Sequence, residues 1–232
     1  CRTERMFNAR DRLGLFVDMI MAKTIEERKQ VLEKLKVLQK SDFKEILKVM
    51  EGYPVTIRLL DPPLHEFLPN VEELINRVHS LEKQNAPEEL ANTKKILARA
   101  RELAEINPMM GHRGVRVGIT FPEIYEMQIR AICEAAGELA KEKIDARAQI
   151  MVPQVGSVDE LNEIKRIYDS IKSSVESNLG MKLKINFGTM LEVVRSCLTA
   201  DEIAKTAEFF SFGTNDLTQA VFSFSREDAE GK

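Results

Sequence analysis

Residues 183–193, LKINFGTMLEV, and residues 208–216, EFFSFGTND, decide the fold class, because each is a short apolar run containing a glycine and ending in an acidic segment. Each run is continuous rather than alternating, which is typical of parallel strands buried on both faces. We therefore predict that both runs are strands of one parallel sheet. Similar runs predict three more strands, and a possible remnant of another lies at residues 1–4: VTIRLLD (55–61), VRVGI (115–119) and AQIMVPQV (148–155).

Stretches with helical periodicity separate these strands. One is expected to begin at Pro122 and Glu123, and another follows Ser157, whose hydroxyl and Glu160 form a predicted capping box. Strands that alternate with helices of this length predict βαβ units. Residues 70–107 carry two further helical patterns, which we interpret as a helical pair inserted into the domain.

The predicted fold class is α/β, a (β/α)8 TIM-type barrel that is truncated and carries the inserted pair. Five strands are fewer than eight, and 232 residues fall slightly short of the about 250 that such a barrel needs. Residues 1–232 are therefore interpreted as one partial barrel domain. Because the chain does not begin with Met, we expect it to belong to a longer protein, with the last strands and other domains outside it.

The composition excludes several classes of partner. The formal net charge is −3, so the basic excess expected of a protein that binds nucleic acid or an anionic membrane is absent. No stretch approaches the ~20 apolar residues of a membrane span, and the opening segment is not a signal peptide. Three widely spaced cysteines form neither a disulfide framework nor a zinc site. This pattern favours a reducing compartment, the cytoplasm or an organelle whose transit peptide would lie outside this chain.

Polar residues collect where the predicted strands end, the position at which α/β barrels place their active sites. Glu192 and Asp216 are 24 residues apart, one strand–helix–strand step, so neighbouring strands could present both carboxylates to one Mg²⁺ ion. Arg58 interrupts an apolar run. The alternatives are that each acid caps a helix and that Arg58 is a rim residue paired with Asp61 or Glu66.

Two segments favour an anionic substrate. FSFGTNDLTQ offers backbone N–H groups, a hydroxyl and an amide at a strand end, which suit a small anion beside a metal. NPMMGHRGVRVG contains Arg113 and Arg116, whose guanidinium groups match phosphate or carboxylate. Together with Arg2 and Arg58, this set suits an anionic substrate that reacts through a charged intermediate.

Four blocks carry a family resemblance: CRTERMF, VTIRLLDPPLHEFLP, NPMMGHRGVRVGITFPEIY and FFSFGTNDLTQ. They resemble the C-terminal domain of the pyruvate phosphate dikinases, within the phosphoenolpyruvate-utilising enzymes. That broader group includes phosphoenolpyruvate synthase and enzyme I of the sugar phosphotransferase system. The second and third blocks favour the dikinases, and the resemblance extends over the whole chain.

The resemblance implies roles for particular residues. Arg2 and Arg58 would bind the phosphoryl group, with Arg113 and Arg226 as supporting cations. Glu192 and Asp216 would hold Mg²⁺. The substrate would be oriented by Asn215 with the backbone around Gly213 and Thr214. No catalytic residue is expected in this chain, because the family's proton-donating cysteine lies on a strand beyond Lys232, so the fragment alone should be inactive. Cys1, Cys133 and Cys197 are interpreted as structural.

The resemblance also implies a reaction and partners. A phosphohistidine on a swivelling domain would exchange its phosphoryl group with pyruvate through a Mg²⁺-stabilised enolate. A nucleotide-binding domain of the same parent chain would charge that histidine, so that ATP, pyruvate and phosphate become AMP, phosphoenolpyruvate and diphosphate. A homodimer is implied as well.

Three alternatives remain at this point. The first is a related phosphotransferase of the same group, and the second is a metal-dependent pyruvate aldolase or lyase, against which the several arginines argue. The third is a non-catalytic binding module. Fold alone does not choose among them.

Overall fold

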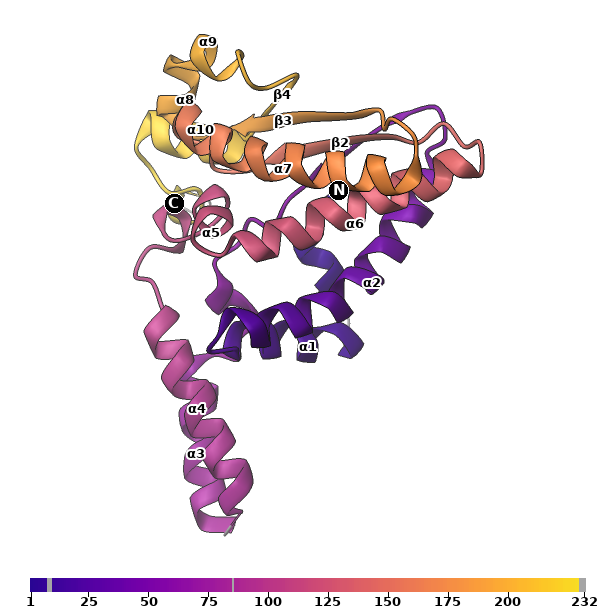
Figure 1. The fold of residues 1–232 in the computed structure, drawn as a ribbon. Coiled ribbons are helices and arrows are strands. Elements are labelled where there is room, and N and C mark those ends of the chain that lie inside the picture. Colours follow the sequence, from indigo (N-terminus) through magenta and orange to yellow (C-terminus); the bar gives the residue numbers. More distant parts are fainter. Residues whose placement is uncertain (8–9, 85, 230–232) are drawn as a thin grey trace.

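A computed structural model describes residues 1–7, 10–84 and 86–229. Its centre is a parallel sheet of four strands in the order β1-β2-β3-β4 (Figure 1). Arg2 adds a single parallel bridge to Arg58, so the remnant expected at residues 1–4 is present in this reduced form. The strands are β1 (Pro54–Arg58), β2 (Arg147–Val152), β3 (Ile185–Leu191) and β4 (Phe210–Phe212). The sheet curls like half of a barrel, an α/β arrangement compatible with a truncated TIM-type barrel.

The strand predicted at residues 115–119 is wrong. These residues form helix α5 (Val115–Thr120), in which the Gly118 N–H donates to the Gly114 carbonyl oxygen at 3.2 Å. Val115 and Val117 are fully buried in this turn. Because a short apolar run looks the same in a buried helix and in a buried strand, its sequence pattern did not distinguish the two.

The helices begin where local chemistry allows it. The capping box of Ser157 and Glu160 is confirmed at the start of α7, and Pro122 opens α6 as expected. Thr24 and Glu27 form a second capping box before α2. The helices other than α5 are α1 (Arg10–Met21), α2 (Ile25–Val49), α3 (Val71–Gln84), α4 (Pro87–Leu103), α6 (Pro122–Lys141), α7 (Val158–Leu179), α8 (Val194–Leu198), α9 (Ala200–Ile203), α10 (Thr214–Phe222) and α11 (Arg226–Ala229), with 3-10 turns η1 (Thr3–Phe7), η2 (Leu64–Phe67) and η3 (Pro108–Met110).

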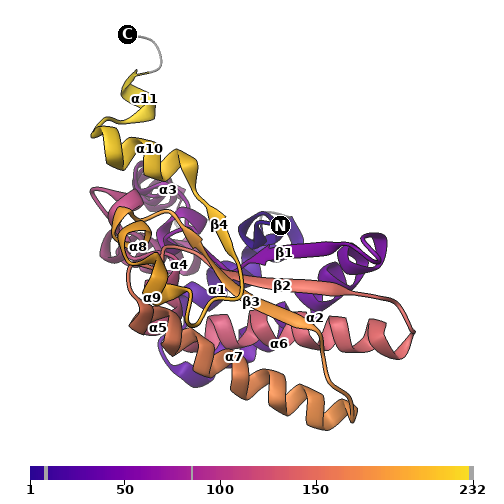
Figure 2. The ribbon, with the colours of Figure 1, turned by 90° about the horizontal axis from the view of Figure 1, so that it is seen from above.

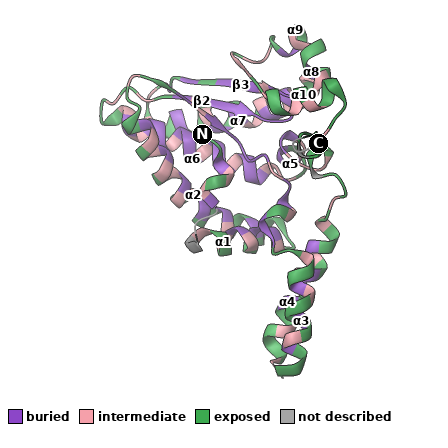
Figure 3. Ribbon diagram, turned by 180° about the vertical axis from the view of Figure 1, so that it is seen from behind, coloured by how far each residue is buried: buried purple, intermediate pink, exposed green. Residues whose placement is uncertain are grey.

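The hydrophobic core lies between one face of the sheet and the helices. Ile57, Ile150 and Phe187 are aligned across β1, β2 and β3, and all three are fully buried. Helix α6 packs between the sheet and α2, and it is buried along most of its length (Figure 3). On the other face of the sheet Asn186 is exposed and Gln149 half-buried, so the burial expected on both faces is not found there.

Helices α3 and α4 occupy the stretch expected to hold a helical pair. They pack against each other and project from the body of the domain (Figure 1). At the other end of the chain, α10 and α11 extend beyond β4 (Figure 2). Among the described residues, no helix is both long and apolar enough to cross a bilayer.

Candidate functional site

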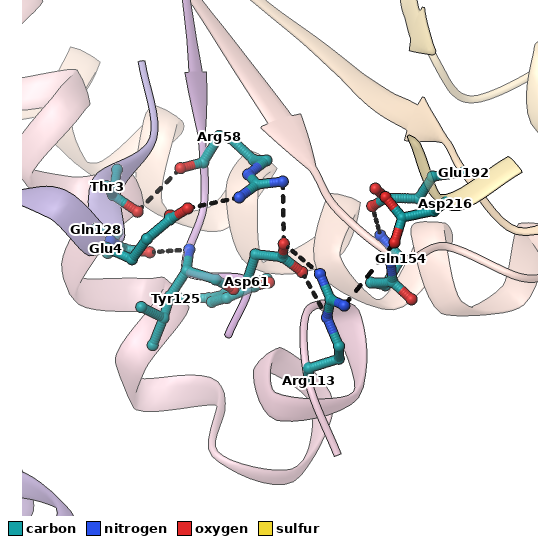
Figure 4. A network of polar contacts seen from close by, with 11 residues as sticks. Thr3, Glu4, Arg58, Asp61, Arg113, Tyr125, Gln128, Gln154, Glu192 and Asp216 are labelled. Atoms are coloured by element: carbon teal, nitrogen blue, oxygen red, sulfur yellow. Dashed lines mark hydrogen bonds and ion pairs between the residues drawn. The ribbon is translucent and has the colours of Figure 1, made fainter. Parts of the chain in front are cut away.

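The carboxyl ends of three strands converge on one polar cluster (Figure 4). Arg58 is the last residue of β1, Glu192 follows β3, and Asp216 lies in the first turn of α10, directly after β4. Arg113 reaches the cluster from the loop before α5. The structure therefore brings together four of the residues that the sequence singled out.

Asp61 lies at the centre of this cluster and was not among the predicted site residues. Its Oδ1 accepts a hydrogen bond from Arg113 Nε at 3.1 Å, and its Oδ2 accepts one from Arg113 Nη2 at 2.6 Å. Arg58 Nη1 lies 2.9 Å from the same Oδ2. The signal in the sequence is the position of Asp61 three residues after Arg58, which predicts only a possible ion pair at the rim.

The two arginines are thus held before any ligand arrives. Arg58 is buried, and its second partner is Glu4, whose Oε1 lies 2.6 Å from Nη2. The pairing of Arg58 with Asp61, raised as an alternative to ligand binding, is present. The ion pair does not exclude a ligand, because a guanidinium has five N–H donors in a fixed fork. Burial lowers the pKa of Arg113, but its hydrogen bond to Asp61 and the nearby carboxylates outweigh this, so the pKa is raised overall.

Glu192 is a buried carboxylate with one oxygen free. Its Oε1 accepts a hydrogen bond from the backbone N–H of Gln154 at 2.7 Å, whereas Oε2 is buried with no hydrogen-bond partner among the described residues. Burial, and then the negative charges of Asp61 and Asp216, raise the pKa of Glu192 to about 7. Carboxyl groups whose pKa is raised in this way by burial and by neighbouring charges are concentrated at functional sites.

Gly213 allows the chain after β4 to approach Glu192 closely. A Cβ atom at this position would lie 2.4 Å from the Glu192 Cβ and 2.8 Å from its Oε2. The glycine thereby permits the first turn of α10, which contains Asp216, to lie beside Glu192. Asp216 Oδ1 is also 4.0 Å from Arg113 Nη1.

The remaining predicted residues surround this cluster or lie outside it. Arg2 is exposed and lies on the bridge to Arg58. Thr214 and Asn215 are exposed on the first turn of α10. Arg226 lies in α11, which extends beyond α10 (Figure 2), and its backbone N–H donates to Gln219 at 2.8 Å.

The charges in the cluster suit a cation. Two guanidinium groups face four carboxylates, those of Glu4, Asp61, Glu192 and Asp216. Within the described residues, no group of three or more His, Cys, Asp or Glu side chains is arranged to hold a metal ion. Mg²⁺ needs only one or two carboxylates when substrate oxygens and water complete its coordination. The free Oε2 of Glu192 with Asp216 fits that pattern.

The loop that carries Arg113 is held by several polar contacts. Glu105 Oε1 accepts the backbone N–H of His112 at 2.6 Å, and Arg116 Nη1 donates to the Gly111 carbonyl oxygen at 2.8 Å. His112 Nε2 lies 2.9 Å from the hydroxyl of Thr120, which itself donates to the Arg116 carbonyl oxygen at 2.7 Å.

The three cysteines differ in burial, and Cys1 lies beside the cluster, because its carbonyl oxygen accepts the Arg58 N–H at 2.9 Å. Cys133 is fully buried in α6, and burial raises its pKa to about 12, so it is an unreactive thiol at neutral pH. Cys1 and Cys197 are exposed.

Comparison with known proteins defines the class. Residues 1–232 match the family model described as "PEP-utilising enzyme, PEP-binding domain", so the chain belongs to that family. Relatives at 46–54% identity are dikinases, which confirms the resemblance seen in the motifs. The chain is 54% identical over its whole length to "Pyruvate, phosphate dikinase" of Entamoeba histolytica, of which it covers 26%. It is 48% identical over 98% of its length to "Pyruvate, phosphate dikinase 1, chloroplastic" of Arabidopsis thaliana, and 46% identical over 99% to "Pyruvate, phosphate dikinase" of Clostridium symbiosum. The chain spans about a quarter of the length of these relatives.

Proposed function

We propose that this domain is the phosphoenolpyruvate/pyruvate site of a pyruvate phosphate dikinase. A phosphoryl group would be exchanged here between pyruvate and a phosphohistidine on another domain of the parent chain. The observation that carries the proposal is the cluster itself. Arg58, which is buried, and Arg113, which is partly buried, are both held by Asp61 beside Glu192, whose buried Oε2 has no hydrogen-bond partner among the described residues. The identity of 46–54% to dikinases favours this function over the related phosphotransferases and over a pyruvate aldolase.

The arginines would bind the anionic groups of the substrate. Arg58 and Arg113 share Asp61 as a partner, which fixes their forks relative to each other. Arg2, next to Arg58 across the bridge, would supply a third guanidinium. Asn215 and the backbone of Gly213 and Thr214 would orient the substrate, and Arg226 would require α11 to approach the cluster.

Glu192 and Asp216 would hold Mg²⁺. When bound, Mg²⁺ supplies positive charge that offsets the negative charge on phosphoryl and enolate oxygens. Glu192 is well placed for this role, because its Oε2 is buried with no hydrogen-bond partner among the described residues and could bind a cation. Gly213, three residues before Asp216, permits the close approach to Glu192.

The other steps would belong to the rest of the parent protein. A nucleotide-binding domain would charge the swivelling histidine domain from ATP and phosphate, and the overall products would be AMP, phosphoenolpyruvate and diphosphate. The proton that converts the enolate to pyruvate would come from a donor other than the buried Cys133. A homodimer is part of the same proposal.

The test uses the full-length protein and phosphoenolpyruvate-dependent phosphorylation of its histidine domain. Glu192→Gln and Asp216→Asn should each reduce the rate by at least ~100-fold, since metal stabilisation of a developing charge contributes several kcal/mol. Asp201→Asn removes an exposed carboxylate on α9 and is the matched control. Near-normal rates in both site variants would contradict the proposed metal site.

A further inference from the structure

Two fully buried polar side chains on α6 contact the same residue of the chain after β1. The Tyr125 hydroxyl donates to the Leu60 carbonyl oxygen at 2.8 Å, and the Leu60 N–H donates to Gln128 Oε1 at 2.8 Å. Tyr125 and Gln128 are both 0% exposed. A buried polar group is costly unless it is hydrogen-bonded, so these two side chains and the Leu60 backbone satisfy one another.

Leu60 lies where the sheet stops supplying partners. The Leu59 N–H still bonds to Met151 at 3.0 Å, continuing the ladder between β1 and β2, and the Asp61 carbonyl oxygen accepts from Gly114 at 2.8 Å. Tyr125 and Gln128 bind Leu60, the residue between Leu59 and Asp61. Residues 59–61 are therefore fixed by contacts from three separate parts of the chain.

These contacts fix the backbone directly before Asp61. Leu60 and Asp61 are adjacent, so a shift of the Leu60 peptide group would move the side chain that holds both Arg58 and Arg113 (Figure 4). We infer that Tyr125 and Gln128 are positioning residues: they act through Leu60 and Asp61 to hold the two arginines in the geometry that binds the anionic substrate. This inference rests on the proposed function.

The network continues to η1, the 3-10 turn that contains the second partner of Arg58. Gln128 Nε2 donates to Gln39 Oε1 at 3.4 Å, and Gln39 Nε2 lies 3.8 Å from the Met6 sulfur. Met6 and Glu4 both belong to η1, and Glu4 pairs with Arg58. Burial raises the pKa of Tyr125 well above its ordinary value, so the hydroxyl keeps its proton and remains a donor.

The chain offers a matched control for Tyr125. The Tyr168 hydroxyl donates to the Ile185 carbonyl oxygen at 2.7 Å, and Tyr168 is 4% exposed. Ile185 is the first residue of β3, at the amino end of the sheet, whereas the candidate site lies at the carboxyl end. Tyr125→Phe and Tyr168→Phe thus remove the same kind of buried bond at opposite ends of the sheet.

The experiment compares both variants in the full-length protein, measuring kcat and KM for phosphoenolpyruvate-dependent phosphorylation of the histidine domain together with thermal unfolding. Both variants should lose stability to a similar extent, because each leaves a buried carbonyl oxygen without its donor. Tyr125→Phe should also lower kcat/KM by roughly tenfold, mainly by raising KM, because the two arginines would no longer be held in the geometry that binds the substrate. Tyr168→Phe should leave kcat/KM unchanged.

The other outcomes distinguish a failure of the positioning role from a failure of the proposed function. An active wild type with equal kcat/KM in the two variants would overturn the positioning role while leaving the proposed function intact. A wild type that transfers nothing from phosphoenolpyruvate would overturn the proposed function, and this inference with it. If Tyr125→Phe does not fold, Gln128→Met, which keeps the length of the side chain and removes its hydrogen bonds, should show the same rise in KM. If Tyr125→Phe and Gln128→Met both misfold while Tyr168→Phe folds, the role of Tyr125 and Gln128 is purely structural.

Discussion

Gly213 lies so close to Glu192 that a Cβ atom on the glycine would be 2.4 Å from the Glu192 Cβ. A Cβ atom essentially never lies within 3.0 Å of a carbon atom of another residue that is not its neighbour in the chain. The Glu192 Cβ is also not the end of a flexible side chain, so it cannot easily move away. An added methyl group must therefore move either Glu192 or the start of α10. The relationship makes Gly213 a sensitive point of the candidate site.

We predict that Gly213→Ala lowers phosphoenolpyruvate-dependent phosphoryl transfer by at least ~10-fold in the full-length protein, because a small displacement of reacting groups is costly. Gly14→Ala is the control. It lies within α1 and has no atom within 4 Å of the added Cβ, so it should be neutral or slightly stabilising. Equal activity of the two variants would show that Glu192 tolerates the displacement.

Arg58→Lys tests whether a guanidinium fork is needed. Arg58 contacts Asp61 through Nη1 and Glu4 through Nη2, and a lysine ammonium cannot hold both partners and a phosphoryl group in the same geometry. We expect phosphoenolpyruvate-dependent phosphorylation to fall at least ~10-fold. Arg147, the first residue of β2, is exposed and pairs with Asp145, so Arg147→Lys should not change the rate of phosphorylation. A wild-type rate for Arg58→Lys would leave Arg58 as an ion-pair residue only.

Glu192 should make stability depend on pH when Mg²⁺ is removed. The folded protein keeps the Glu192 proton up to a pKa of about 7, compared with an ordinary value of 4.5, so it binds more protons than the unfolded chain between these values. Stability therefore decreases as pH rises through this window. With a chelator, wild type should lose more thermal stability over this range than Glu192→Gln does. Excess Mg²⁺ should remove the difference in slope, because a bound cation stabilises the carboxylate. If wild type and Glu192→Gln showed the same dependence of thermal stability on pH in the presence of the chelator, Glu192 would not have the raised pKa in the metal-free protein.

The approach of Glu192 and Asp216 could be predicted from the sequence, because the carboxyl ends of neighbouring parallel strands lie at one edge of a sheet. The central place of Asp61 could not. Its partner Arg113 is 52 residues away and lies on a loop whose path depends on α5, a segment predicted as a strand.

Tyr125 and Gln128 were missed for a different reason. An amphipathic pattern reveals one buried face of a helix. Helix α6 lies between the sheet and α2 and is buried on most sides, so polar residues within it had no recognisable role until their partner, Leu60, was placed.

The exposed apolar surface formed by β4 and the segment that follows it should make residues 1–232 prone to association when produced alone. Four large apolar side chains in this region are exposed: Phe212, Val221, Phe222 and Phe224. β4 is also the last strand of the described sheet, so its outer backbone groups can pair with another chain. We expect the isolated polypeptide to bind a hydrophobic dye and to unfold over a broad temperature range, unlike the same segment within the full-length protein. A sharp transition at the same temperature in both would show that this surface needs no cover.

The last prediction concerns the loop that carries Arg113. Glu105 Oε1 accepts the His112 N–H at 2.6 Å, and the second carboxylate oxygen lies where a Cβ on Gly111 would be. Removing the side chain in Glu105→Ala should free the backbone directly before Arg113 and raise KM for phosphoenolpyruvate several-fold, since the typical net contribution of one hydrogen bond is about 1 kcal/mol. Glu105→Gln keeps an acceptor for the N–H and should retain most of the affinity. Glu102→Ala, which removes an exposed carboxylate paired with Arg99 on α4, is the matched control and should change nothing. If Glu105→Ala behaved like Glu102→Ala, the contacts of Arg116 with Gly111 and of the His112 ring with Thr120 would be sufficient to hold the loop.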